Sequence, residues 1–227
     1  MKIDILTLFP EMFTALNSSI IGRAVKNGDL EINIINIRDF AHDKHKRCDD
    51  TPYGGGAGMV MMVEPIFKAV NSVKTEKTHV IYTSPRGRTL SQKVVRELAQ
   101  KEHIVILCGH YEGVDERAIE LCVDEEISIG DYVLTGGEIP AMAITDAVSR
   151  YVDGVVKQPS LEEESFANGL LEYPQYTKPQ VFEGLEVPAV LLSGNHQEVD
   201  KWRHEQALKI TKERRPDLLK GGKDSEN

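Results

Sequence analysis

The sequence lacks two features of exported or membrane proteins. None of its apolar runs is long enough to cross a membrane. Its first residues, Met1 to Asp4, lead straight into a predicted strand and show no signal-peptide pattern. Cysteine is also scarce: Cys48, Cys108 and Cys122 are the only three, and no two form a C-x-x-C pair. An odd, sparse set of thiols is typical of the reducing cytosol. We therefore expect a cytoplasmic protein with no membrane partner.

Two nucleotide-binding motifs are missing as well. The sequence contains no G-x-x-x-x-G-K-[ST], and no G-x-G-x-x-G lies between a predicted strand and a predicted helix. The glycine-rich stretch Gly54–Gly58 follows a long polar loop and lacks the lysine of a P-loop. These absences argue against an NTPase that cradles phosphates.

One segment has the residue types of a metal site. His42, His45 and Cys48 follow one another at three-residue spacing. A fourth ligand is missing, and the interleaved cations would repel a metal ion. We predict no metal site here. The cations Lys44, Lys46 and Arg47 suit contacts to a phosphate backbone better.

The net charge of −9 is unevenly distributed. Residues 112–164 hold 14 Asp and Glu against 3 Lys and Arg, whereas residues 201–223 hold 8 Lys and Arg against 3 Asp and Glu. A basic C-terminal helix on an acidic protein is the footprint expected for a polyanion. A solvated helix face accounts for the same spacing equally well.

Strand and helix patterns alternate along the first two thirds of the chain, which predicts an α/β domain with a mainly parallel sheet. A stretch without periodicity, 154–176, is predicted to be a linker, possessing Pro159, consecutive glutamates and Pro174. We therefore expect an α/β domain at 1–153, the linker, and a small helical domain at 177–227. The predicted strands are 2–8, 30–37, 79–83, 103–108 and 126–129, and the predicted helices are 10–27, 65–73, 91–101, 116–122, 138–151 and 196–215.

Three glycine-containing loops follow the later strands, at Tyr82–Arg88, Cys108–Arg117 and Gly130–Gly137. Open α/β sheets bind ligands at the carboxyl ends of their strands, and glycines let backbone groups approach a ligand closely. Each loop alone is most simply a turn, but three in succession predict one composite pocket. Two further features stay ambiguous on spacing alone: Arg150 is either functional or a helix cap, and Glu162–Glu164 are either catalytic or a solvated charge run.

Several longer motifs occur in order: Pro52–Met59 (PYGGGAGM), Cys108–Gly113 (CGHYEG), Ser128–Leu134 (SIGDYVL), Gly136–Glu138 (GGE) and Leu191–His196 (LLSGNH). Together they resemble the bacterial tRNA (guanine-N1-)-methyltransferases of the TrmD type. The resemblance extends from Leu8–Phe13 to Arg214-Arg215-Pro216, so it covers essentially the whole chain.

The resemblance implies a fold that strand and helix patterns cannot supply. Enzymes of this type belong to the SPOUT class, whose α/β domain is tied in a deep trefoil knot, and they carry a small all-helical C-terminal domain that grips tRNA. They are homodimers with active sites built across the interface. Their reaction moves a methyl group from S-adenosylmethionine to N1 of the guanosine just 3′ of the anticodon, position thirty-seven of tRNA, which protects the reading frame. Mg²⁺ assists that reaction.

The resemblance also implies roles for particular residues. Arg150 matches the arginine that faces O6 of the guanine, and Glu112 matches a residue near the methionine end of the donor. The matching donor-binding residues are Tyr82, Thr83, Ser84, Pro85, Gly109, Tyr111, Glu112, Gly113, Ser128, Ile129, Gly130, Tyr132, Val133, Leu134, Gly136, Gly137 and Pro140. The matching RNA-binding residues are Lys44, Lys46, Arg47, Tyr53, Gly55, Asn195, His196, Arg203, Arg214 and Arg215.

The sequence departs from the family pattern at the general base. N1 of neutral guanine carries a proton that a base must remove, and a cation must stabilise the charge that builds on O6. The family's base is an aspartate before Ser-Phe, and Glu164 stands there in this chain, on a loop one residue shorter. Two rival functions stay open: a ribose 2′-O methyltransferase of the same class, and a non-catalytic tRNA-binding protein in which Glu164 marks lost chemistry.

Overall fold

The computed structural model describes residues 1–157, 161 and 164–220. The chain divides into two compact units, Met1–Val156 and Lys157–Asn227. The division falls inside 154–176, the segment that the sequence predicts to be a linker.

The first unit is built on a five-stranded sheet with the order β2-β1-β6-β5-β7. All four pairings between neighbouring strands are parallel, so the prediction of a mainly parallel sheet is confirmed. The central strand β6 is buried along its whole length, as its unbroken apolar run requires when both faces of a sheet are covered. The strands are β1 (Lys2–Thr7), β2 (Glu31–Asn36), β5 (Thr78–Thr89), β6 (His103–Cys108) and β7 (Glu125–Ser128).

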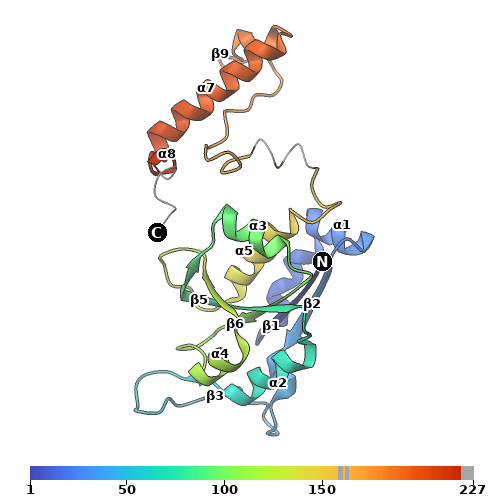
Figure 1. Ribbon diagram of the computed structural model, residues 1–227, viewed down its shortest axis with the longest axis vertical. Helices are drawn as coiled ribbons and strands as arrows, with labels where there is room; N and C mark the ends of the chain where they lie inside the picture. The colour runs from blue at the N-terminus through green and yellow to red at the C-terminus, as the bar shows by residue number, and fades with distance from the viewer. Residues whose placement is uncertain (158–160, 162–163, 221–227) are drawn as a thin grey trace. The chain divides into compact units, whose positions relative to one another are not determined.

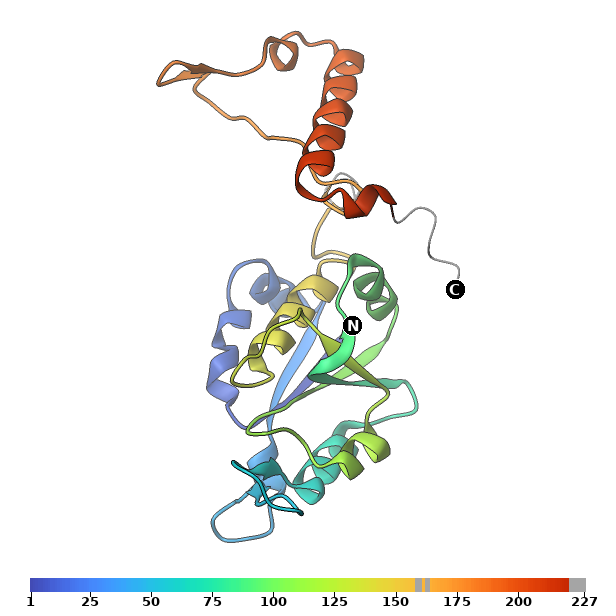
Figure 2. The same ribbon diagram turned by 90° about the vertical axis from the view of Figure 1, so that its left-hand side faces the viewer.

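Helices cover both faces of this sheet (Figures 1 and 2). One face packs against the 3-10 helix η1 (Pro10–Asn17) and the helices α1 (Ser19–Asn27), α3 (Gln92–Ala99) and α5 (Glu138–Ser149), whose apolar residues share one core with the strands. The other face packs against α2 (Val63–Val73) and α4 (Glu116–Cys122) in a second core. The small elements η2 (Ile37–Phe40), β3 (Asp49–Asp50) and β4 (Val60–Met61) complete this side.

A buried polar chain joins the amino ends of four strands. The carboxylate of Asp4 is fully buried and accepts a hydrogen bond from Nδ2 of Asn33 at 2.8 Å. His103 places Nε2 2.9 Å from Asp4 Oδ2 and Nδ1 2.7 Å from Oγ1 of Thr78. These hydrogen bonds link β2, β1, β6 and β5 near their amino ends, at the end of the sheet opposite the glycine loops. They therefore help to fix the strand register.

Several element boundaries differ from the sequence prediction, and the predicted helix 10–27 is divided into η1 (Pro10–Asn17) and α1 (Ser19–Asn27). Helix α2 begins at Val63 rather than Pro65, because the first helical turn lacks backbone acceptors for its N–H groups and so tolerates a proline. Strand β5 runs on to Thr89, although the prediction ended it at Thr83. Its pairing with β7 shifts register between Thr83 and Arg88, so the predicted loop is an irregular continuation of the strand.

Helical spacing predicts that α5 turns inward the apolar residues Ile139, Met142, Ala143, Ala147, Val148 and Tyr151, and this prediction is partly wrong. Ile139 is 48% exposed in the single chain, and Ala143 is exposed as well. The buried apolar residues are instead Ala141, Ile144 and Val148. Apolar spacing placed this face incorrectly because the polar residues Glu138, Thr145 and Ser149 are also buried here.

Two loops come into backbone contact where β6 ends and α5 begins. The N–H of Gly137 donates to the carbonyl oxygen of Gly109 at 2.8 Å. A Cβ at Gly137 would lie 2.7 Å from the nitrogen of Gly109 and 2.8 Å from Cα of Cys108, and it would be closer still to Oγ1 of Thr83. Backbone atoms cannot swing away as a side chain can, so this crossing requires glycine.

The second unit contains α7 (His196–Arg214), the short helix α8 (Asp217–Lys220) and the 3-10 helix η3 (Ala189–Leu192). It also contains a two-stranded antiparallel hairpin, β8 (Val181–Phe182) with β9 (Leu185–Glu186). The prediction that this domain is all-helical is therefore wrong at the hairpin. Gly184, with φ of +82°, supplies the left-handed residue that so tight a turn needs.

The Gly137 crossing leads to a stability prediction. Gly137→Ala should lower the free energy of unfolding by about 1–3 kcal/mol, the range for overpacking. The backbone at residue 137 has φ of −84°, so alanine introduces no dihedral strain and the loss reports steric crowding alone. Urea denaturation measures it. The control Glu120→Gln changes an exposed side chain of α4 and should change stability by about 0.5 kcal/mol or less. Equal effects of the two variants would contradict the crowding.

Candidate active site

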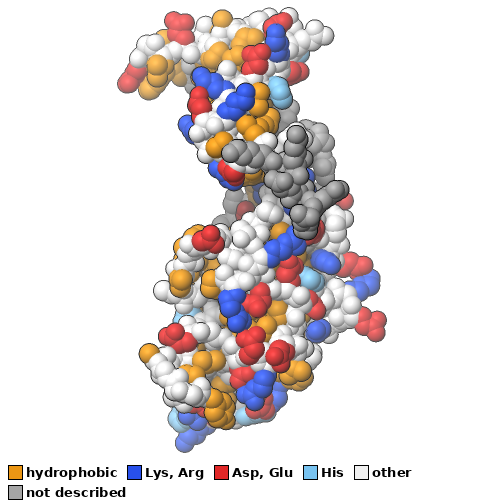
Figure 3. Space-filling model, turned by 60° about the vertical axis from the view of Figure 1, so that its left-hand side comes forward, with side chains coloured by type: hydrophobic (Ala, Val, Ile, Leu, Met, Phe, Trp, Pro, Cys, Tyr) orange, Lys and Arg blue, Asp and Glu red, His pale blue; other side chains and the backbone are white. Residues whose placement is uncertain are grey.

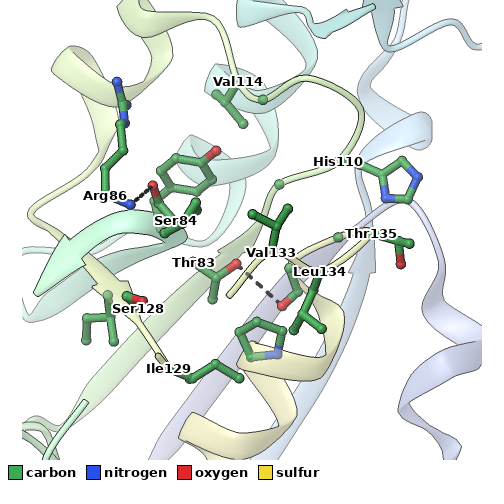
Figure 4. A pocket seen from close by; sticks show the side chains of 18 of the residues that line it. Thr83, Ser84, Arg86, His110, Val114, Ser128, Ile129, Val133, Leu134 and Thr135 are labelled. Atoms are coloured by element: carbon green, nitrogen blue, oxygen red, sulfur yellow. Dashed lines mark hydrogen bonds between the residues drawn. The ribbon is translucent and has the colours of Figure 1, made fainter. Parts of the chain in front are cut away.

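A pocket of about 390 Å³ lies at the carboxyl ends of β5, β6 and β7. Three segments line it: the irregular part of β5, the loop after β6, and the loop between β7 and α5. Figure 4 shows side chains from all three segments around the cavity. The position agrees with the rule that open α/β sheets bind ligands at the carboxyl ends of their strands.

The β5 segment contributes buried hydroxyl groups. Thr83 and Ser84 are 5% and 6% exposed. Oγ1 of Thr83 donates to the carbonyl oxygen of Leu107 at 3.2 Å and lies 3.4 Å from that of Gly137, a contact drawn in Figure 4. The Ser84 hydroxyl accepts from the N–H of Arg86 at 3.2 Å. Thr83 thus ties the β5 segment to strand β6 and to the start of α5.

The loop after β6 turns sharply beneath a tyrosine ring. Tyr111 and Gly113 have φ of +59° and +130°, and the N–H of Gly113 donates to the carbonyl of His110 at 3.1 Å. A Cβ at Gly109 would lie 2.8 Å from Cε2 of Tyr82, so the ring packs directly on this glycine. Burial raises the pKa of the Tyr82 phenol, and the Glu126 carboxylate raises it further, so the phenol stays neutral.

The loop between β7 and α5 presents apolar side chains to the pocket. Ser128 anchors it, since its hydroxyl lies 3.0 Å from the carbonyl oxygen and 3.2 Å from the N–H of Gly130. Tyr132 and Val133 are 55% and 86% exposed, although such residues are usually buried. An exposed apolar wall beside backbone polar groups is typical of sites for small organic ligands.

The structure brings together every residue that the sequence predicts to bind the donor. All of them line this pocket, from Tyr82 in β5 to Pro140 in the first turn of α5. Six further lining residues were not predicted. All of them except Ile127 lie inside loops that the sequence singled out, and the charge of Arg86 and Glu116 was an available signal. The full set of additional lining residues is Arg86, His110, Val114, Glu116, Ile127 and Thr135.

Charged groups gather on one side of the pocket. The guanidinium of Arg86 lies 3.5 Å from Glu126 and 3.3 Å from Glu116. The Glu126 carboxylate, followed by Glu116, raises the pKa of Arg86. The second oxygen of Glu126 is buried and has no hydrogen-bond partner among the described residues. The cluster therefore offers both signs of charge to a ligand.

Glu112 lies at the rim of the pocket and is exposed. Its N–H donates to the carbonyl of Met59 at 2.9 Å, which joins the pocket loop to the glycine-rich segment Pro52–Met59. Its carboxylate lies directly against the backbone of Gly58.

The two other predicted catalytic residues belong to different units. Arg150 is half-buried and caps the C-terminus of α5, where its N–H bonds the carbonyl of Asp146 at 3.3 Å. Glu164 is half-buried in the second unit, and its carbonyl accepts from the N–H of Ala167 at 3.1 Å. The neighbouring Glu162 and Glu163 lie outside the described residues.

The predicted RNA-binding residues of the first unit are on the surface. Tyr53 is 99% exposed beside Gly55, and Lys44 is exposed. Lys46 and Arg47 are also exposed, but they form ion pairs of 2.7 Å with Asp39 and 2.6 Å with Asp43, respectively. A phosphate would have to compete with these carboxylates.

The predicted RNA-binding residues of the second unit are distributed over α7 and its ends. Asn195 caps α7 by accepting from the N–H of Glu198 at 3.5 Å, and the exposed His196 begins the helix. The guanidinium of Arg203 lies 5.0 Å from the ring centre of Tyr173.

At the other end of α7, Arg214 is exposed and Arg215 pairs with Asp217 at 2.6 Å. On the face drawn in Figure 3, basic side chains of this unit are interspersed with apolar and acidic ones. The basic side chains on that face therefore do not form one continuous patch.

The described part of the chain contains no group of three or more His, Cys, Asp or Glu residues that could hold a metal ion. Near the predicted phosphate contacts, His42 instead lies 3.0 Å from Glu64. Within the same residues, no helix is long and apolar enough to span a bilayer.

Comparison with known proteins agrees with the geometry of the pocket. A family model described as tRNA (Guanine-1)-methyltransferase TrmD matches residues 1–221. A curated protein of Carboxydothermus hydrogenoformans, named tRNA (guanine-N(1)-)-methyltransferase, is 62% identical over 97% of this chain and 88% of its own length. A protein of the same name from Ruminiclostridium cellulolyticum is 56% identical over 96% of both chains. The resemblance seen in the sequence motifs is confirmed, and the chain belongs to the TrmD family of tRNA (guanine-1)-methyltransferases.

Proposed function

We propose that this protein transfers a methyl group from S-adenosylmethionine to N1 of the guanosine on the 3′ side of the anticodon, position thirty-seven of tRNA. The observation that carries the proposal is the composite pocket, because every residue predicted to bind the donor lines it. Family membership across residues 1–221 supports the same activity. We place the reaction in the cytoplasm.

The pocket has the chemistry that this donor requires. S-adenosylmethionine supplies an electrophilic methyl group on a sulfonium, flanked by an adenosine and an amino acid. Val133 and Leu134 give an apolar wall for a flat base, and the nearby glycines expose backbone groups for hydrogen bonds. Arg86 and Glu116 offer opposite charges to the amino-acid end. The residues that line the pocket therefore fit S-adenosylmethionine.

Three residues of the chain carry the transfer. The Glu164 carboxylate accepts the N1 proton of guanine while N1 forms its bond to the methyl carbon and the carbon–sulfur bond breaks. The guanidinium of Arg150 stabilises the negative charge that develops on O6. Glu112, at the rim of the pocket, faces the methionine end of the donor, which carries positive charge.

This assignment includes a homodimer, with the Glu164 of one subunit serving the pocket of its partner. Met12 and Ile139, 41% and 48% exposed, give η1 and α5 an apolar surface that a second copy would cover. We also propose that the α/β domain is knotted, which is supported by the tight crossing of Gly137 and Gly109. The second unit, helical apart from its hairpin, grips the tRNA.

We also propose that Mg²⁺ assists the reaction. The described residues contain no cluster of three or more His, Cys, Asp or Glu that could hold the ion. We therefore assign Mg²⁺ no protein ligands and no step of the transfer.

The first prediction concerns the product. The purified protein, incubated with labelled S-adenosylmethionine, should methylate a leucine tRNA transcript that has guanosine 3′ of the anticodon, and should not methylate a transcript with adenosine there. Only guanine at that place presents the N1 proton and the O6 that the residues above require. Digestion of the tRNA followed by mass spectrometry should yield N1-methylguanosine. A ribose-methylated nucleoside would point to the 2′-O rival, and tRNA binding without transfer would point to a non-catalytic binder.

The second prediction concerns the general base. Glu164→Gln keeps the size of the side chain and removes its basicity, so kcat should fall roughly 10²–10⁴-fold, the range for general-base catalysis. Donor affinity, measured by calorimetry, should change little. Glu186→Gln is the matched control, because Glu186 is an exposed glutamate of the same unit and is expected to retain full activity. Full activity of Glu164→Gln would remove Glu164 from the mechanism and direct attention to Glu163 and Glu172.

The third prediction concerns RNA contacts. If Lys44 contacts a tRNA phosphate, Lys44→Ala should reduce the slope of log K against log salt by roughly one unit, because one fewer counterion is released. Filter binding over a range of salt concentrations measures this slope. Lys77→Ala is the control, since Lys77 is an exposed cation at the opposite edge of the sheet, where it pairs with Glu102. Equal slopes for the Lys44 variant and the native protein would exclude that contact.

A further inference from the structure

The glycine-rich segment Pro52–Met59 is joined to the donor pocket by its backbone. The N–H of Glu112 donates to Met59 at 2.9 Å, that of Met61 donates to Gly113 at 2.9 Å, and that of Asp115 donates to Met61 at 3.0 Å. Met61 and Val114 also form a parallel bridge. The segment that carries the exposed Tyr53 is therefore continuous, through hydrogen bonds, with the pocket loop 109–115.

One glycine of this segment lies under the carboxylate of Glu112. A Cβ at Gly58 would be 2.5 Å from Cγ and 2.8 Å from Cδ of Glu112, and closer still to Oε1. These are side-chain atoms at a rim position, so an added methyl group would displace the carboxylate rather than the backbone. The bare backbone at residue 58 thus sets where the Glu112 carboxylate lies.

We infer that Gly58 is a positioning residue for the methyl transfer, holding the Glu112 carboxylate at the donor pocket by having no side chain of its own. The inference rests on the proposed function, because it needs the donor to occupy this pocket. It also makes the segment Pro52–Met59 a single element that presents Tyr53 to RNA and supports Glu112 at the donor. The alternative is that Gly58 is conformationally required and nothing more, since its φ is +81°.

The chain offers a matched control for that alternative. Gly54 belongs to the same segment and has φ of +87°, so alanine there meets the same backbone strain. A Cβ at Gly54 would have no atom within 4 Å. The difference between Gly58→Ala and Gly54→Ala therefore isolates the contact with Glu112.

The test measures donor binding by calorimetry and steady-state transfer to the guanosine-containing transcript for both variants. Gly58→Ala should lower kcat/KM for S-adenosylmethionine roughly 10-fold or more relative to Gly54→Ala, because small misplacements of site groups cost up to about 10²-fold. The two variants should unfold at similar urea concentrations. In the Glu112→Ala background, which lacks the obstructing atoms, Gly58→Ala should have no further effect on kcat/KM.

Three results would overturn the inference. Equal kcat/KM for Gly58→Ala and Gly54→Ala would leave Gly58 with a conformational role only. An undiminished Gly58→Ala effect in the Glu112→Ala background would show that it acts through another group. In both cases, transfer by the native protein would leave the proposed function intact. A native protein that neither binds nor uses the donor would instead refute the proposed function, and this inference with it.

Discussion

The pocket depends on one steric constraint, the backbone contact between the end of β6 and the start of α5. Gly137 donates to Gly109, and the space that a Cβ would fill is occupied by Thr83 and the Cys108–Gly109 backbone. Thr83 of the β5 segment contacts both sides of this crossing, since its Oγ1 bonds the carbonyl oxygens of Leu107 in β6 and of Gly137. A side chain at residue 137 would separate the three walls of the cavity. Glycine is therefore required at residues 137 and 109 for the packing of the pocket itself, in addition to letting backbone groups approach a ligand.

At the amino ends of the strands, opposite the pocket, hydrogen bonds hold the sheet in register. There Asp4, His103 and Thr78 link neighbouring strands through buried hydrogen bonds of 2.7–2.9 Å. Between these two ends of the sheet, the central strands β1, β6 and β5 are largely apolar and buried. The strands place the three loops next to one another, and the loops supply the polar groups and the exposed apolar groups of the pocket. This division of roles explains how an unremarkable core can support a specific site.

Apolar runs predicted the parallel sheet and glycine-containing strand ends predicted the three loops of the pocket, because both are local signals. The individual residues of the pocket followed from the resemblance to the TrmD type. Prediction from the sequence failed where tertiary contacts decide the outcome. Strand β5 continues beyond Thr83 because β7 pairs with it again after a shift in register. The inner face of α5 includes buried Glu138, whose carboxylate accepts from Thr7 at 2.9 Å, and no apolar period could reveal that pair. The hairpin near Gly184 is too short to give a periodic signal. The contact between Gly58 and Glu112 joins segments far apart in the chain.

Hydrogen exchange with and without S-adenosylmethionine tests most directly whether three loops form one donor site. The donor should slow exchange of backbone amides in 83–86, 109–114 and 128–137 together, with the same dependence on donor concentration, because all three line the same cavity. The strand ends around His103 should not respond. Protection confined to one loop, or distributed over the second unit alone, would contradict the composite site and the function proposed for it.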